Sequence, residues 1–325
     1  MKKLFLFMIL IALGQSSQAQ TEVILRFDHR LDGKAFALNQ EATSPKGTKY
    51  KTTRLQFYIS GLKITHDGSQ ELALNNVYLF VDPSNPNSKE FSLGTFTDIS
   101  IIEKIDFAIG VDAASNHLDP ASYPLNHALA PKNPTMHWGW TAGYRFISLS
   151  ANAARTNGSF LDVVNIEGLG DTNFKTKSYP AQTIVENGKI YIDFLAEYNL
   201  LLDGIVIAGG ANNHGETGSA AVLIANGSQK VFSPFIHHTA TKDAYNNLYS
   251  EVIYGGNVVF IKYSFTSNSK LQFKLYDSNG KTMQESTLNT KEGILNIEDQ
   301  VPTGNYFYSF TQEQQVVSTG KLVNR

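Results

Sequence analysis

In Arg54-Leu-Gln-Phe-Tyr-Ile-Ser60, apolar residues occupy every second position, at Leu55, Phe57 and Ile59. This period of two is typical of a β-strand that turns one face toward a core. Comparable runs recur at residues 22–27, 72–81, 101–111, 144–150, 160–166, 190–194 and 205–208. Asp-Gly and Asn-Gly pairs separate several of them, and we expect one helix near 219–225. The sequence therefore predicts an all-β protein built on an antiparallel β-sandwich.

The composition is that of a folded, weakly acidic protein. The chain has 325 residues, of which 42% are hydrophobic and 17% charged, with a formal net charge of −2. No basic stripe is present, which argues against nucleic acid as a partner. Cysteine is absent, so disulfide frameworks, thiolate metal sites and thiol nucleophiles are excluded.

The N-terminus has the pattern of a secretory signal peptide. Two lysines follow Met1, an apolar run extends from Leu4 to Leu13, and Ser17 and Ala19 are the small residues before a cleavage site. We therefore assign residues 1–19 to the signal peptide, and the mature chain carries 25 − 29 = −4 charges once Lys2 and Lys3 are removed. An N-terminal membrane anchor is the alternative, but the run is short for a bilayer span, and the mature chain has no transmembrane segment.

The C-terminal part forms a second unit. We place the first domain at residues 20–238, a polar linker at 239–251 and a compact β unit at 252–325. The last unit contains Lys274-Leu-Tyr-Asp-Ser-Asn-Gly-Lys281 and Thr303-Gly-Asn-Tyr-Phe-Tyr308. It resembles the type A C-terminal sorting domain of the type IX secretion system of Bacteroidetes, a small Ig-like β-sandwich. The resemblance implies export through the periplasm by the type IX secretion machinery, to the cell surface or the medium.

The densest group of chemically useful side chains lies between residues 105 and 146. His117, His127 and His137 fall within or beside a loop-like stretch at 112–137. Trp138 and Trp140 are two apart, which places both on one face if the segment is extended. Because imidazole suits copper, zinc and nickel, the histidines indicate a possible metal site.

The same block resembles the MbnP-like family of copper-binding proteins. The matching residues are Ile109-Gly-Val-Asp112 with Asn116-His117, Pro124-Leu-Asn126, and Met136-x-Trp-x-Trp-x-x-Gly-Tyr-x-Phe146, with Phe27-x-His29 upstream. The resemblance implies an exported β-sandwich that binds copper through imidazoles. It also implies that one tryptophan is oxidised to kynurenine by a di-haem partner of the cytochrome c peroxidase type.

Carried onto this chain, the resemblance makes His29 and His117 the expected copper ligands and Trp138 or Trp140 the expected site of oxidation. One position departs from the pattern, because relatives often have His-Leu-Gly where this chain has Asn165-Ile-Glu.

The available donors limit the kind of copper site. Cu(I) prefers sulfur, and the mature chain offers only Met136 and Met283, so we expect imidazole and carboxylate ligands. Secondary candidates are His137, Asp112, His214 and Glu216. His214 and Glu216 lie in a polar cluster that is either a metal pair or a tight turn.

We therefore expect an exported copper-binding protein that is not an enzyme. The alternative is a metal-free surface module that binds glycan or protein through Trp138, Trp140 and nearby tyrosines. A third interpretation is an enzyme that uses Asp112, Asp119 or Glu216, but catalytic carboxylates must lie close together in space, which sequence does not show.

Overall fold

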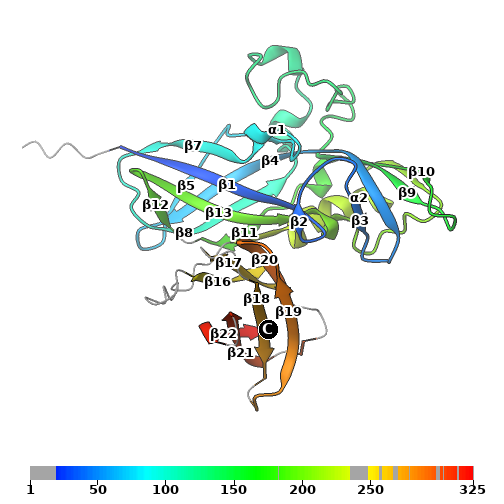
Figure 1. Ribbon diagram of the computed structural model, residues 1–325. Coiled ribbons are helices and arrows are strands. Elements are labelled where there is room, and N and C mark those ends of the chain that lie inside the picture. Colours follow the sequence, from blue (N-terminus) through cyan, green and yellow to red (C-terminus); the bar gives the residue numbers. More distant parts are fainter. Residues whose placement is uncertain are drawn as a thin grey trace, which may run out of the picture.

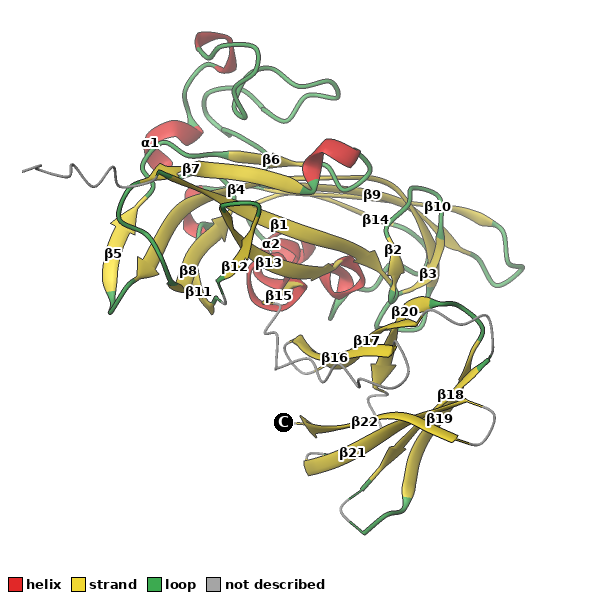
Figure 2. Cartoon of the chain, turned by 60° about the vertical axis from the view of Figure 1, so that its left-hand side comes forward, coloured by secondary structure: helices red, strands yellow, loops and turns green. Residues whose placement is uncertain are grey.

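The computed structural model describes residues 20–181, 183–234, 248–255, 258–265, 270–277, 279–297, 301–302, 304–312 and 315–324. The predicted signal peptide lies outside these residues, as does residue range 239–247 of the predicted linker. Strands dominate the regular secondary structure of the described part, and helices are few and short (Figures 1 and 2), which confirms the all-β prediction.

The first domain contains two sheets. The smaller has the order β12-β13-β1-β2, with β15 paired to β13 and β7 to β1. Its strands are β1 (Thr21–Leu31), β2 (Lys34–Ala35), β7 (Glu90–Phe96), β12 (Ile184–Glu186), β13 (Lys189–Glu197) and β15 (Phe232–Pro234).

The larger sheet has the order β11-β8-β4-β9-β10-β14, and β3, β5 and β6 also pair with β4. Its strands are β3 (Glu41–Thr43), β4 (Lys49–His66), β5 (Gln70–Ala73), β6 (Leu79–Val81), β8 (Ile102–Ile109), β9 (Ile147–Ala154), β10 (Phe160–Gly168), β11 (Lys177–Pro180) and β14 (Ala211–Gly215). The long strand β4, which contains the Arg54–Ser60 segment, is thus the centre of this sheet.

Most strand pairs are antiparallel, but β1 pairs with β13 and β10 with β14 in parallel. Helical segments are short: α1 (Ala113–Asn116), α2 (Gly218–Asn226), η1 (Pro86–Ser88), η2 (Pro120–Ser122), η3 (Asp171–Asn173), η4 (Tyr198–Leu202) and η5 (Gly227–Val231). The helix α2 confirms the one predicted near 219–225.

The strand expected at residues 205–208 is wrong. Ile205 and Ile207 are buried in the core, but they belong to irregular backbone. Gly204 on one side and Gly209-Gly210 on the other have positive φ angles, so turns enclose the segment and leave it too short to pair with a strand. Burial alone therefore explains its apolar sequence.

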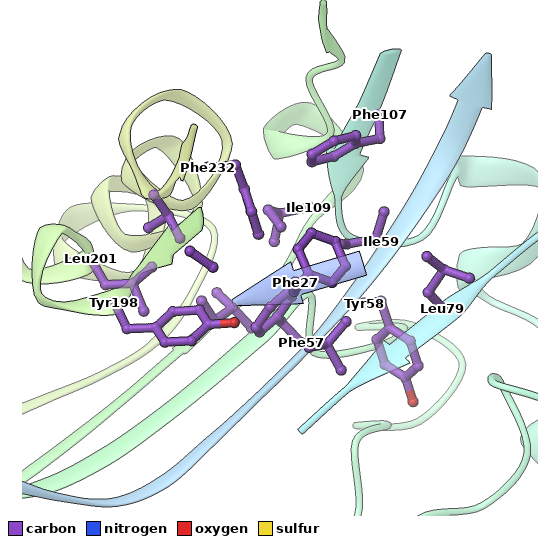
Figure 3. Packing of buried hydrophobic residues seen from close by; sticks show 14 of the residues in the cluster. Phe27, Phe57, Tyr58, Ile59, Leu79, Phe107, Ile109, Tyr198, Leu201 and Phe232 are labelled. Atoms are coloured by element: carbon purple, nitrogen blue, oxygen red, sulfur yellow. The ribbon is translucent and has the colours of Figure 1, made fainter. Parts of the chain in front are cut away.

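Aromatic side chains fill the space between the two sheets (Figure 3). The ring of Phe232 lies 5.5 Å from that of Phe27 and 5.3 Å from that of Phe107, measured between centroids. Phe57 joins the same group at 6.1 Å from Phe232. The inward period predicted for the Arg54–Ser60 segment is confirmed by these contacts.

The other face of β4 is buried as well, which the alternating pattern does not predict. Tyr58 is fully buried and points away from the Phe27–Phe232 group (Figure 3), toward Tyr144 at a ring distance of 5.3 Å. Tyr144 belongs to the long connection between β8 and β9, which stands out from the strands in Figures 1 and 2. This connection therefore covers part of the outer face of the larger sheet.

The C-terminal unit has its own core, centred on Ile261, Phe273 and Phe310. It comprises one sheet of β16-β17-β20 and one of β19-β18-β21-β22. The strands are β16 (Leu248–Gly255), β17 (Val258–Phe265), β18 (Leu271–Tyr276), β19 (Thr282–Leu288), β20 (Glu292–Ile297), β21 (Gly304–Gln312) and β22 (Gln315–Asn324). Strand β16 begins at Leu248, inside the segment predicted as linker.

Candidate functional site

His29 lies in the core rather than at a surface site. Its position in β1 continues the inward series of Leu25 and Phe27, and the residue is 5% exposed. Its Nε2 donates to the carbonyl of Ser88 at 2.7 Å, and its Nδ1 accepts from the Tyr198 hydroxyl at 2.7 Å. Burial lowers the pKa of His29 and keeps it neutral. Both ring nitrogens are therefore engaged in hydrogen bonds, so His29 can act as a copper ligand only if one of these two bonds breaks.

His117 belongs to a different hydrogen-bond network. It follows α1, and its Nδ1 donates to the carbonyl oxygen of Trp140 at 2.7 Å. Its Nε2 lies 3.1 Å from Oδ2 of Asp171. The Trp140 carbonyl and then Asp171 raise the pKa of His117, because both favour its protonated form. The structure thus gives His29 and His117 no common partner.

Trp138 contacts a cation and an imidazole. The guanidinium carbon of Arg145 is 5.0 Å from the centre of the indole, within the range of a cation–π contact. The ring of His214 is 5.2 Å from the indole, at an angle of 57°. Trp138 is 40% exposed, whereas Trp140 is 70% exposed. The two tryptophans therefore have different surroundings despite their spacing of two.

The buried carboxylate of Glu167 contacts both groups that lie against Trp138. Glu167 is 4% exposed, and its Oε2 lies 2.9 Å from Nε of Arg145 and 3.6 Å from Nδ1 of His214. Its Oε1 accepts from Ser148 at 3.2 Å and lies 3.8 Å from Nη1 of Arg54. Two guanidinium groups thus share one carboxylate.

His214 has a ring nitrogen without a partner. Register pairing of β10 with β14 sets His214 opposite Glu167, so Nδ1 is directed to the carboxylate. Nε2 is buried and has no hydrogen-bond partner among the described residues. A buried polar atom is usually satisfied, so this nitrogen is a candidate to bind a ligand.

We refer to Trp138, Arg145, Glu167 and His214, together with His117, which is bonded to the carbonyl of Trp140, as the Trp138 corner. Backbone hydrogen bonds join its parts: Leu169 donates to Gly215 at 3.1 Å, and Trp138 donates to Gly143 at 2.9 Å. Gly143 has a φ of +76°, and a Cβ there would lie 2.5 Å from Oδ1 of Asn116, so the loop reaches α1 only with glycine at this position.

The remaining predicted residues have other roles. Glu216 packs its side chain against Gly170, and its charge acts on His117. Asp112 accepts from Tyr78 at 2.6 Å and lines an open cleft of about 580 Å³. His137 forms an isolated bridge with Tyr144.

Asn165, which stands where the family resemblance led us to expect histidine, accepts from the Ser150 hydroxyl at 3.1 Å. Within the described ranges, no group of three His, Asp or Glu side chains is arranged to hold a metal ion. No described helix is long and apolar enough to cross a membrane.

Comparison with protein families identifies both units. The MbnP family model matches residues 20–214, which is more than half of the chain. The chain belongs to the MbnP family. The model of the secretion system C-terminal sorting domain matches residues 256–325, and this tail makes the MbnP chain a secreted or cell-surface protein handled by the type IX secretion machinery.

Two solved structures show distant similarity to the chain. MbnP from Methylosinus trichosporium is similar at 13% identity and a TM-score of 0.39, with 62% of this chain and 82% of that one covered. The chicken CNTN1 FN1-FN3 domains are similar at 9% identity and a TM-score of 0.21, with 89% and 67% covered. No curated protein gives a significant match.

Sequence reasoning did not identify the charged part of the site in this MbnP chain. Arg145 lies inside the tryptophan block and Glu167 follows Asn165 by two positions, but both look like ordinary strand residues. Only the pairing of β10 with β14 and the loop closure at Gly143 bring them to Trp138. Glu167 alternates with Val164 and Ile166 as an outward-facing polar residue would, so the sequence carries no signal that it is buried.

Proposed function

We propose that this chain is an exported copper-binding protein whose ion is held at the Trp138 corner, with His214 as the principal ligand and His117 as the second. The observation that supports the proposal best is the buried Nε2 of His214, which lies beside Trp138 without a partner among the described residues. Imidazole nitrogen is a common copper ligand. Copper is here the cargo of the protein.

The donor set fits two imidazoles better than a larger site. Of the methionines, Met136 is buried, and its sulfur lies 3.1 Å from Nη2 of Arg54. His117 offers Nε2 only by giving up its contact with Asp171. Protonation opposes metal binding at both imidazoles, so copper affinity should fall as the pH decreases.

Trp138 is the tryptophan whose oxidation would change the site. Its indole contacts His214 and Arg145, whereas Trp140 contributes its backbone carbonyl to His117 and leaves its side chain 70% exposed. We infer that a di-haem peroxidase-like partner would act on Trp138.

We also infer a binding role rather than catalysis. The three carboxylates considered for an enzyme have separate partners: Asp112 accepts from Tyr78, Asp119 caps η2 through Ala121, and Glu216 packs on Gly170. Such engagement supports structural roles for these groups and not a catalytic pair.

Copper titration of the purified mature protein tests the proposal. We expect one copper per chain, and we expect His214→Gln to weaken binding by at least about 10-fold, with a smaller loss for His117→Gln. His127→Gln is the matched control, because its ring stacks on Tyr123 away from the corner. Wild-type affinity in both His214→Gln and His117→Gln, or no bound copper in the wild type, would refute the site.

Intact mass before and after exposure to the haem partner tests the oxidation separately. The expected result is a mass change that Trp138→Phe abolishes and Trp140→Phe preserves. The opposite assignment would move the oxidation to Trp140.

One observation favours the metal-free alternative. Trp140 is 70% exposed and Leu125, in the same connection between β8 and β9, is 92% exposed. Exposed apolar side chains indicate a binding surface when they form one contiguous patch. A glycan or protein partner lost on Trp140→Ala, in a protein that binds no copper, would establish this function instead.

A further inference from the structure

A second cavity lies under the connection between β8 and β9, and Met136 and His137, which directly precede Trp138, contribute to its lining. Its volume is about 220 Å³, and Tyr58, Asp119, Lys132, His137 and Tyr144 are among its lining residues. It forms where the connection folds over the outer face of β4, and its lining includes Tyr58 of that strand, which the connection buries fully. This cavity is separate from the Glu167 and His214 side chains of the Trp138 corner.

Two polar atoms of its lining lack partners. The hydroxyl of Tyr58 and the Nε2 of His137 are buried, and neither has a hydrogen-bond partner in the described part of the chain. The ring of Tyr58 is held in place by Tyr144 and Phe80, at 5.3 Å from each. Figure 3 shows that the Tyr58 hydroxyl points away from the aromatic core. Burying a hydroxyl without a partner is costly, so this group is suited to a ligand.

The backbone determines which atom of His137 carries the proton. Nδ1 accepts from the backbone N–H of Gly139 at 3.1 Å, so Nδ1 must be unprotonated. In neutral imidazole the proton is then on Nε2, which makes Nε2 a hydrogen-bond donor. Burial lowers the pKa of His137 and so favours this neutral form.

Lys132 adds a positive charge without a counter-ion. Its Nζ donates to the carbonyl of His127 at 3.0 Å and lies 5.1 Å from the centre of the Phe80 ring. None of the described carboxylates lies within ion-pair distance of it. Burial lowers its pKa, so an anion nearby would stabilise the charged form. Asp119 lines the cavity too, but its Oδ1 already accepts from the backbone of Ala121 at 2.9 Å.

We propose that this cavity binds a small monocarboxylate, with the Tyr58 hydroxyl, the His137 Nε2–H and the Lys132 ammonium as its hydrogen-bond donors. Two neutral donors and one cation match the single charge and the several lone pairs of a carboxylate. A phosphate dianion would leave one charge uncompensated and would be repelled by Asp119 more strongly than a monoanion. The volume suits a molecule of the size of acetate or lactate, because it is below the range of drug-sized pockets.

Calorimetric titration of the full mature chain with acetate and lactate tests the proposal, with glycerol and inorganic phosphate as comparison probes. We expect binding of the two carboxylates and a raised melting temperature, and no binding of glycerol. Tyr58→Phe should lose at least 10-fold in affinity without a lower melting temperature, because the hydroxyl has no protein partner to lose among the described residues. Lys132→Gln should lose binding by a similar factor.

Tyr50→Phe is the matched control. Its hydroxyl donates to Asn199 at 3.0 Å, remote from the cavity, so this variant should lower the melting temperature and bind acetate normally. Absence of carboxylate binding to the wild type would overturn the proposal. So would unchanged affinity in Tyr58→Phe, or equal binding of phosphate by the wild type and Tyr58→Phe. If Tyr58→Phe does not fold, Lys132→Gln decides the matter, since this half-buried side chain has only the His127 carbonyl and the Phe80 ring as partners among the described residues. Copper is absent from these assays, so this result is independent of the proposed function.

Discussion

Replacement of His29 by phenylalanine distinguishes a core histidine from a metal ligand. The variant would keep an aromatic ring between Phe27 and Tyr198, whose centroids lie 5.9 and 5.7 Å from that of the imidazole. It would remove the two 2.7 Å hydrogen bonds to Ser88 and Tyr198. The change therefore isolates the polar contribution of the side chain.

The cost follows from the two partners left behind. A buried polar group without its partner costs roughly 1–3 kcal/mol, and the Ser88 carbonyl and Tyr198 hydroxyl are both buried, so we expect a loss of about 2–4 kcal/mol. For a domain of this size that corresponds to a decrease in melting temperature of roughly 5–15 °C. Copper affinity should stay at the wild-type value.

Urea unfolding and copper titration of the same preparation check both parts. The double variant His29→Phe with Tyr198→Phe should recover about 1–2 kcal/mol, because the orphaned hydroxyl is gone. Unchanged stability together with lost copper binding would refute this reasoning and restore His29 as a ligand.

Three further outcomes are expected from the contacts described above. Burial lowers the pKa of His29 in the folded state, so the unfolded chain binds more protons than the folded chain once the pH falls toward and below the ordinary pKa of histidine. The free energy of unfolding should therefore fall as the pH drops from about 7.5 to about 5.5, with a shallower slope in His29→Phe. Equal slopes in urea titrations of the two proteins would contradict this. Glu167→Ala should cost about 3–5 kcal/mol of unfolding free energy, because it removes the carboxylate that two guanidinium groups share. Glu71→Ala, which breaks a surface ion pair with a lysine, should cost less than about 1 kcal/mol. Similar losses in the two variants would show that the charge cluster is not buried in solution. Gly143→Ala should destabilise the protein by about 1–3 kcal/mol more than Gly139→Ala does. Both glycines have positive φ angles, but only a Cβ at position 143 would clash with Asn116. Equal shifts in melting temperature would argue against the contact between Gly143 and Asn116.

The apolar patterns were sufficient for the fold class and for the second unit. Alternation at Leu55, Phe57 and Ile59 predicts a strand with one buried face, and the core contacts of Phe57 agree. The same pattern does not indicate that Tyr58 on the opposite face is buried, because its cover comes from the connection that contains Tyr144. Periodicity reports the faces of one strand and carries no information on what distant segments cover them.

Some properties of the functional residues also follow from the sequence, whereas others follow only from the tertiary structure. The sequence by itself determined that the chain is an exported, cysteine-free β protein with both tryptophans and three of its eight histidines between residues 105 and 146, because residue type and local spacing are properties of the chain. Only the tertiary structure decided that His29 hydrogen-bonds within the core while His214 meets Trp138. That choice depends on strand register: β1 pairs with β13 and β10 with β14, and a shift by one residue would reverse the face of each side chain.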